Sequence, residues 1–311
     1  MIAETRKQEG KYEAYFADIR SLCSLIPSMS VEEVKELHID SLRTYLKYLA
    51  KMIKQLLCSS TTLSTKFSWK LQRAIYPLEA RKAKSLYSMG ESREIREAPM
   101  KVLDDLNICE VRAKLRVEAS TKGVLTPMQE EGKRWWYKKR VKYLKIIQGA
   151  FKKSLGFIIH NTSLEHSLAL LYVGDKYIIE MHGAADIVLL TSLKCYYTGN
   201  EIYVPLVLLF EFTLFKDALK VVKTRLEAYA TALYGIYGYP VIPVLAIIED
   251  EEAGKGKLYI LYKESLFSIT LTKKLKRLEK IIANSVKPKR ASKEICISCD
   301  IELRRKCPFY H

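Results

Sequence analysis

The order of apolar segments along residues 103–262 constrains the fold more than any other feature of this chain. Short apolar segments bounded by turn residues predict strands at 167–173, 177–190, 202–212, 241–248 and 257–262. Helical spacing predicts helices at 103–117, 129–153 and 216–235. The turn residues Gly174 and Asp175 join the first two strands into a hairpin. This order of helices and strands indicates an α/β fold in which a mixed sheet is flanked by helices.

Residues 1–100 have a different, helical pattern. Ser30 and Glu33 form a capping box ahead of apolar residues that recur near the helical period as far as Leu56. Pro77 interrupts a second helical stretch, and residues 89–99 have the composition of a linker. The pattern predicts a helical N-terminal extension at 1–100 and a second domain at 101–311, which ends in a cysteine-containing tail at 286–311.

The charge of the chain favours an anionic partner. Its 311 residues include 52 Lys and Arg against 35 Asp and Glu, a net charge of +17 that attracts nucleic acid or an anionic membrane surface. The N-terminus lacks the apolar core of a signal peptide, and no run approaches the roughly 18 apolar residues that cross a bilayer. We expect a cytoplasmic protein, whose seven cysteines favour metal binding or packing over disulfides.

Three cysteines near the C-terminus form the sharpest motif. Cys296 and Cys299 are spaced so that both sulfurs can reach one metal, and Cys307 follows beside a proline. The fourth ligand is either His311, which would complete a zinc knuckle, or the distant Cys109. Spacing alone does not choose between zinc and an iron–sulfur cluster.

Two acids mark a candidate site in the predicted sheet. Asp186 follows a Gly-Ala-Ala stretch in an otherwise apolar strand, and Glu211 ends the next strand. Acids on adjacent strands can share a divalent cation, which would polarise a phosphate and activate water. The alternative is that Asp186 pairs with a neighbouring base such as Arg225, because buried acids need partners.

A basic stretch at 133–153 is the third feature, with nine basic residues and no acidic ones. Basic side chains neutralise phosphates, and interleaved aromatic rings can stack on unpaired bases. An amphipathic helix with a solvated face is the alternative. The candidate nucleic-acid contacts are Lys133, Arg134, Trp135, Trp136, Lys138, Lys139 and Arg140.

These motifs occur in an order that resembles the RecB-like exonucleases of the fourth CRISPR-associated (Cas) protein family. The stretch 109–115, Cys-Glu-Val-Arg-Ala-Lys-Leu, resembles that family's Cys-Pro-Arg-Lys-x-Tyr-Leu opening. Gly132 stands where the family has a Gly ahead of a His, and Gly183-x-x-Asp186 matches its Gly-x-x-Asp strand. The Glu-x-Lys and Gln-x-x-x-Tyr motifs have counterparts in the segments beginning at Glu211 and Arg225, and the C-terminal cysteines close the series.

The resemblance covers about residues 105–311 and implies a PD-(D/E)xK nuclease core. It implies that Asp186 and Glu211 hold Mg²⁺ or Mn²⁺, with Arg225 and Tyr229 beside them. It also implies that a [4Fe–4S] cluster clamps the C-terminus onto the first helix of the domain, which favours Cys109 over His311 as the fourth ligand. The implied cluster ligands are Cys109, Cys296, Cys299 and Cys307.

Three positions depart from the family pattern. Trp135 and Trp136 stand in the region where the family has its motif His. Thr213 stands in place of the Lys of Glu-x-Lys, and Arg225 in place of the Gln of Gln-x-x-x-Tyr. The motif Lys would orient the attacking water and stabilise developing charge, which Thr cannot do. Lys216, Lys220 and Lys223, at the start of the next helix, are candidates for a migrated lysine.

Three functions follow from this pattern. The first is a metal-dependent DNA exonuclease that acts on single-stranded or end-containing DNA. The second is a catalytically degenerate DNA-binding subunit, with CRISPR adaptation proteins as its partners or a role in the DNA processing of a mobile element. The third, which needs no nuclease ancestry, is a zinc-knuckle nucleic-acid-binding protein.

Overall fold

The computed structural model describes residues 46–47, 50, 75–78, 93–118, 127–153, 156–197, 200–239, 241–250, 255–260, 266–297, 299 and 301–310. Its strands are β1 (Ile75–Leu78), β2 (Glu94–Pro99), β3 (Phe157–Val173), β4 (Tyr177–Tyr197), β5 (Asn200–Thr213), β6 (Val241–Asp250) and β7 (Lys255–Ile260). Its helices are α3 (Val102–Ile108), α4 (Glu110–Glu118), α5 (Pro127–Lys152), α6 (Ala218–Tyr237), α7 (Leu266–Ile282), α8 (Lys293–Ile297) and α9 (Ile301–Arg305).

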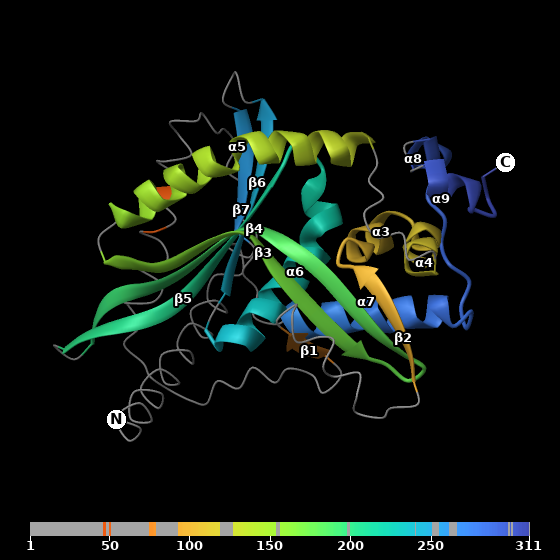
Figure 1. Ribbon diagram of the computed structural model, residues 1–311, viewed down its shortest axis with the longest axis horizontal. Coiled ribbons are helices and arrows are strands. Elements are labelled where there is room, and N and C mark those ends of the chain that lie inside the picture. The colour runs from red at the N-terminus through yellow and green to blue at the C-terminus, as the bar shows by residue number, and fades with distance from the viewer. Residues whose placement is uncertain are drawn as a thin grey trace.

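The described strands form one sheet of seven strands in the order β1-β3-β4-β5-β6-β7, with β2 also pairing with β4 (Figure 1). The β2–β4 and β5–β6 pairs are parallel, and the other pairs are antiparallel. Helix α6 connects β5 to the parallel β6, as a parallel pair requires a crossover. This mixed sheet flanked by helices confirms the predicted fold class and is compatible with a PD-(D/E)xK-like core.

The long strand β4 changes partners along one of its edges. Its first part, residues 177–182, pairs with β2, whereas residues 187–197 pair with β5. On the opposite edge, β3 runs along most of the strand. Residues 183–186 therefore lie at a fork, where β4 has left β2 and has not yet met β5.

The two faces of the sheet carry separate hydrophobic cores. Helices α3, α4, α6 and α7 pack on one face, and α5 packs on the other (Figure 1). Along β5, Val207 and Leu209 face α6, whereas Leu208 and Phe210 face α5. Because side chains alternate along a strand, Glu211 faces the α6 side, next to the fork.

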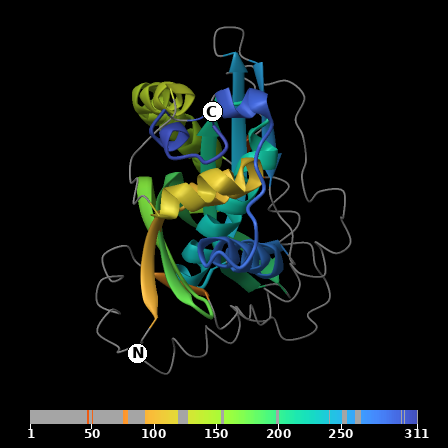
Figure 2. The same cartoon turned by 90° about the vertical axis from the view of Figure 1, so that its right-hand side faces the viewer.

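The C-terminal tail returns from α7 to the first helices of the sheet domain, as the view in Figure 2 also shows. Glu110 of α4 accepts two hydrogen bonds from Arg277, 2.9 Å from Nε and 2.7 Å from Nη2. The backbone of Lys289 bonds to the same residue, with Lys289 N–H 2.7 Å from the carboxylate and Glu110 N–H 3.0 Å from the Lys289 carbonyl. These contacts fix the chain just before α8.

Some predicted elements differ from the structure. Residues 75–78 and 94–99, which the sequence places in a helix and a linker, are the strands β1 and β2. The helix expected at 103–117 is split at Cys109, whose backbone is extended (φ −154°, ψ 107°). Most of the predicted helical extension at 1–100 lies outside the described residues. Among the described helices, none combines the length and apolar character needed to span a bilayer.

Candidate functional site

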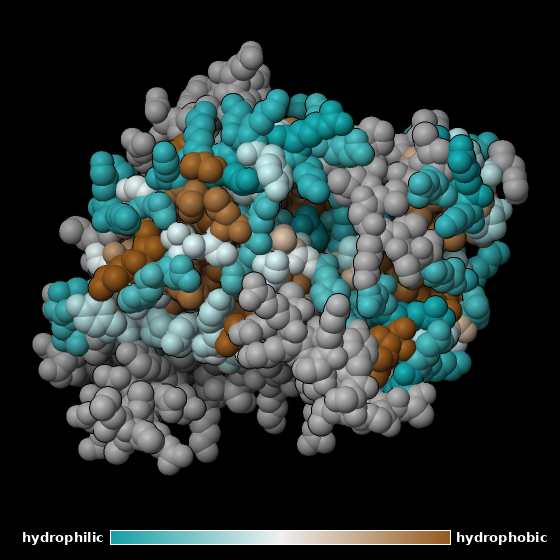
Figure 3. All heavy atoms as spheres, viewed as in Figure 1, coloured by the Kyte–Doolittle hydropathy of each residue, from teal (hydrophilic) through white to brown (hydrophobic). Residues whose placement is uncertain are grey.

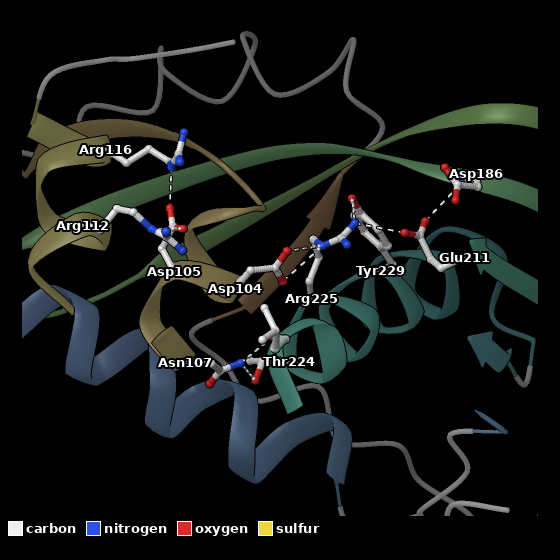
Figure 4. A network of polar contacts seen from close by, with 11 residues as sticks. Asp104, Asp105, Asn107, Arg112, Arg116, Asp186, Glu211, Thr224, Arg225 and Tyr229 are labelled. Carbon is white, nitrogen blue, oxygen red and sulfur yellow. Dashed lines mark hydrogen bonds and ion pairs between the residues drawn. The ribbon is translucent and has the colours of Figure 1, made fainter. Parts of the chain in front are cut away.

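Asp186 and Glu211 meet at the fork between β4 and β5. The backbone N–H of Asp186 donates to Glu211 Oε1 at 3.0 Å, and the N–H of Phe212 donates to Asp186 Oδ2 at 2.8 Å (Figure 4). The backbone pairing of the two strands stops one position earlier, at Ile187 and Phe210. The two carboxylates thus replace ladder hydrogen bonds where the strands diverge, and both side chains are held in place.

Arg225 of α6 lies beside Glu211 and contacts this member of the acid pair (Figure 4). Its Nη1 lies 3.0 Å from Glu211 Oε2 and 3.2 Å from the hydroxyl of Tyr229. Its Nε lies 2.9 Å from Oδ2 of Asp104, which belongs to α3. The predicted residues Asp186, Glu211, Arg225 and Tyr229 are therefore brought together, and Asp104 joins them.

Gly183 makes room for this arrangement. A Cβ atom there would lie 2.8 Å from Cε1 and 2.9 Å from the hydroxyl of Tyr229, closer than side-chain atoms approach each other. The Tyr229 ring consequently packs against the bare backbone of β4, with its hydroxyl on Arg225. The glycine of the Gly-x-x-Asp motif is explained by this close approach rather than by a special backbone angle.

The site is short of positive charge. Burial raises the pKa of Asp186 well above its usual value, and the neighbouring Glu211 carboxylate raises it further. Burial also raises the pKa of Glu211, although Arg225 opposes this shift, and it raises the pKa of Asp104 to about 6. Glu211 and Asp104 contact the Arg225 guanidinium, and Lys101 also interacts electrostatically with Asp104. Asp186 contacts no cation among the described residues, so a further cation would be stabilised beside it.

A third strand contributes another acid, which sequence reasoning missed. The register pairs Leu164 with Ile187 and His166 with Ala185, so Glu165 of β3 lies opposite Asp186. Glu165 has a left-handed backbone (φ 51°), uncommon outside glycine, and its carboxylate also raises the pKa of Asp186. Arg140 Nη1 of α5 lies 3.4 Å from Glu165 Oε1. This contact links the basic helix to the acid pair.

Helix α5 presents much of its predicted basic surface to solvent. Lys133, Arg134 and Lys138 are exposed, whereas Lys139 and Arg140 are half-buried, with the Arg140 guanidinium 3.6 Å above the Tyr137 ring. Hydrophilic side chains line the upper edge of the surface over α5, and hydrophobic ones lie below its left part (Figure 3). The exposed basic side chains could follow a phosphate backbone.

The role expected for Trp136 is wrong. Only 6% of this residue is exposed, and its ring stacks on Phe212 with the ring centroids 5.2 Å apart. Its faces are occupied by the core, so it is not a platform for an unpaired base. Trp135 is half-buried and tilted against Tyr143. Trp136 therefore supports the strand that carries Glu211.

Lys216, a candidate for the migrated lysine, does not contact Asp186 or Glu211 in the structure. Lys216 is exposed and makes no hydrogen bond or ion pair with the described residues. Thr213, at the position of the motif Lys, accepts a hydrogen bond at 3.1 Å from the backbone of Phe215. Its hydroxyl is thereby turned to the loop that leads into α6.

The cysteine tail lies beside α4, next to Cys109. The thiols of Cys109 and Cys307 are near enough to Cys296 to raise its pKa, together with burial, and Arg112 interacts electrostatically with Cys109 and Cys299. All four cysteines are half-buried. His311, the alternative fourth ligand, lies outside the described residues.

Two adjacent acids on α3 connect this region to the acid pair, and the sequence analysis did not identify them. Asp104 contacts Arg225, whereas the fully buried Asp105 pairs with Arg112 at 2.7 Å and with Arg116 (Figure 4). Both acids interrupt the apolar pattern of a buried helix, which is the signal that could have revealed them.

In the described part of the chain, no three His, Cys, Asp or Glu side chains lie close enough together to hold a single metal ion. Mg²⁺ needs fewer protein ligands, since it keeps several waters and binds through one or two carboxylates. Asp186 Oδ1 accepts no hydrogen bond from the described residues, so the oxygen donors fit such an ion.

Comparisons with known proteins give distant structural similarities. No protein family model and no curated protein matches the chain. The crystal structure of SSO0001 superposes with a TM-score of 0.34 and 12% identity, over 65% of this chain and 82% of that one. A "putative exonuclease" from Eubacterium rectale superposes with a TM-score of 0.33 and 9% identity, over 67% of this chain and 88% of that one. We therefore base the function on the site itself.

Proposed function

We propose that this chain is a metal-dependent DNA exonuclease of RecB-like type. The observation that carries the proposal is the acid pair at the fork. Asp186 and Glu211 come from adjacent strands, each is held by a backbone N–H of the other strand, and Asp186 Oδ1 accepts no hydrogen bond from the described residues. Mg²⁺ or Mn²⁺ held there would polarise a phosphate and lower the pKa of a bound water. Arg225 would hold Glu211 in place, and the exposed basic side chains of α5 would bind the DNA backbone.

Asp186→Asn is the direct test of this proposal. The purified protein is expected to bind Mn²⁺ and to degrade linear single-stranded DNA, whereas circular DNA without ends stays intact. Asp186→Asn removes a charged ligand, so both Mn²⁺ binding, measured by calorimetry, and cleavage should be lost. Asp175→Asn makes the same exchange in the exposed β3–β4 turn and should behave like wild type. Cleavage that persists in Asp186→Asn would rule out this site.

A DNA-binding subunit without nuclease activity is the second candidate, favoured by the Arg225–Glu211 contact. An internal guanidinium already neutralises one of the acids, and Thr213 supplies no cation. In that case DNA binding would be salt-sensitive and unchanged in Asp186→Asn, and no Mn²⁺ concentration would support cleavage. Association with CRISPR adaptation proteins and a cytoplasmic location stay predictions under either candidate.

We further propose that the four cysteines hold a [4Fe–4S] cluster that ties the C-terminal tail to α4. Protein purified without oxygen is expected to contain about four irons per chain, and Cys109→Ser should lose them. Cys195→Ser, outside the proposed quartet, is the matched control and should keep its iron. Zinc in place of iron, with a content that Cys109→Ser does not change, would contradict the cluster and favour the zinc knuckle.

A further inference from the structure

Arg225 is fixed by three elements of the fold. Asp104 of α3 binds Nε at 2.9 Å, and Glu211 of β5 binds Nη1 at 3.0 Å. The hydroxyl of Tyr229, one turn along α6, lies 3.2 Å from the same Nη1. A guanidinium is planar, so contacts to two of its nitrogens set the orientation of the third.

The third nitrogen, Nη2, meets no acceptor in the described part of the chain. It is not among the buried polar atoms that lack a partner. The side chain of Arg225 is 19% exposed, in contrast to 6% for Glu211. Arg225 therefore presents a fixed N–H donor group beside the acid pair, where no protein acceptor of the described chain uses it.

The three lysines predicted as replacements have different surroundings, and Lys101, just before α3, interacts electrostatically with Asp104 and Arg225. Lys216 and Lys220 are exposed, and Lys223 interacts electrostatically with Glu227, on the part of α6 that also faces Lys274. Among the described residues, Arg225 is the cation in direct contact with the acid pair. Arg225 projects from α6 toward Glu211, which lies two residues before Thr213 on β5.

We infer that Arg225 supplies the fixed positive charge that a lysine at position 213 would supply, and that its Nη2 binds a non-bridging oxygen of the scissile phosphate. The differences from the family pattern at position 213 (Lys to Thr) and position 225 (Gln to Arg) are then a single exchange. The cation moves from β5 to α6, where it contacts Glu211. This inference rests on the proposed nuclease function and names its charge-stabilising group.

Having arginine in place of lysine as the cation limits what Arg225 can do in the reaction. The water oxygen forms the new bond to phosphorus, the bond to the leaving sugar oxygen breaks, one water proton passes to solvent, and the leaving oxygen takes up a proton. Arginine keeps its proton at all working pH values, so it is not a general base. Arg225 acts by stabilising the negative charge that develops on the phosphate oxygens.

The test compares Arg225→Gln, Arg225→Lys and the double variant Thr213→Lys/Arg225→Gln with wild type. Arg225→Gln should cleave single-stranded DNA about 100- to 1,000-fold more slowly at saturating Mn²⁺, as when a transition-state donor is removed. It should also bind Mn²⁺ several-fold more tightly, because a positive charge next to Glu211 is gone. Arg225→Lys should retain part of the rate, and the double variant should return to within about tenfold of wild type.

The two readouts separate the possible outcomes. Slower cleavage with tighter Mn²⁺ binding supports the inference, because a misfolded site would bind Mn²⁺ more weakly. Weaker Mn²⁺ binding in Arg225→Gln, or a rate equal to wild type, would overturn it while leaving the nuclease proposal intact. If wild-type protein binds no Mn²⁺ and cleaves no DNA, the nuclease proposal fails and the inference fails with it.

Discussion

Asp105→Ala is expected to lower the free energy of unfolding by about 3–5 kcal/mol, a large part of the stability of a typical domain. Asp105 is fully buried and forms ion pairs with Arg112, which is 6% exposed, and Arg116, which is 1% exposed. Alanine would remove the buried carboxylate that these two guanidinium groups share. Burying an uncompensated charge costs far more than the intact pair contributes.

Thermal unfolding checks this expectation, and the midpoint should fall by roughly 10 °C. Glu130→Ala is the matched control, since Glu130 forms an exposed ion pair with Arg134, whose side chain is 79% exposed. Such a pair contributes about 0.2–1 kcal/mol, so its removal should hardly move the midpoint. The double variant Asp105→Ala/Arg116→Met should recover part of the loss. An Asp105→Ala midpoint equal to that of the control would contradict the role of the buried charge.

The Asp105→Ala variant also concerns both candidate sites, the acid pair and the cysteine tail, because α3 is linked to each of them. Asp104 and Asp105 are neighbours on α3: one holds Arg225 at the acid pair and the other holds α4, which carries Arg112 next to Cys109 and Cys299. A shift of α3 would therefore be felt at both sites. Buried charges of this kind often fix one arrangement of helices rather than add stability.

The sequence predicted those parts of the site that depend on local pattern. The hairpin, the strand ending near Glu211 and the helix carrying Arg225 follow from alternation and helical spacing over a few residues. Adjacent strands then place Asp186 beside Glu211. The meeting of these three residues was therefore predictable. The sequence offered a pairing of Arg225 with Asp186 only as an alternative to a metal site, and in the structure Arg225 pairs with Glu211.

The fork itself was not predictable in this way, because it depends on a distant strand. Residues 94–99 carry charged side chains and end in Pro99, so their sequence is typical of a linker, yet they pair with β4. Their backbone partner lies about eighty positions away, and no local pattern records it. The nucleic-acid contact predicted for Trp136 was wrong for a related reason: the spacing of aromatic residues along α5 does not tell which of them pack against the sheet.

Glu227→Gln is expected to remove a pH dependence of stability worth up to about 3 kcal/mol. Glu227 of α6 is 3% exposed, and neither carboxylate oxygen has a hydrogen-bond partner among the described residues. Burial raises its pKa from 4.5 to about 7, although Lys223 and Lys274 oppose the shift. The buried side chain is therefore protonated in the folded protein at pH values where the unfolded chain has already lost the proton.

The direction of the effect follows from this difference. Because the folded-state pKa is the higher one, the stability that protonated Glu227 contributes is complete below about pH 4.5 and is lost as pH rises toward 7. Glutamine carries no titrating proton, so the variant should be more stable than wild type at pH 8, and the difference should shrink toward pH 5. Asp104, Asp186 and Glu211 also have raised pKa values, but they titrate in both proteins, so the difference isolates Glu227.

Urea unfolding at several pH values measures this difference directly. Glu131→Gln, which removes the same charge from an exposed position on α5, should differ from wild type by a small amount that does not vary with pH. If the stability of Glu227→Gln followed that of wild type from pH 5 to pH 8, Glu227 would have to be charged in the folded state. Its buried oxygens would then need partners from the part of the chain beyond the described residues.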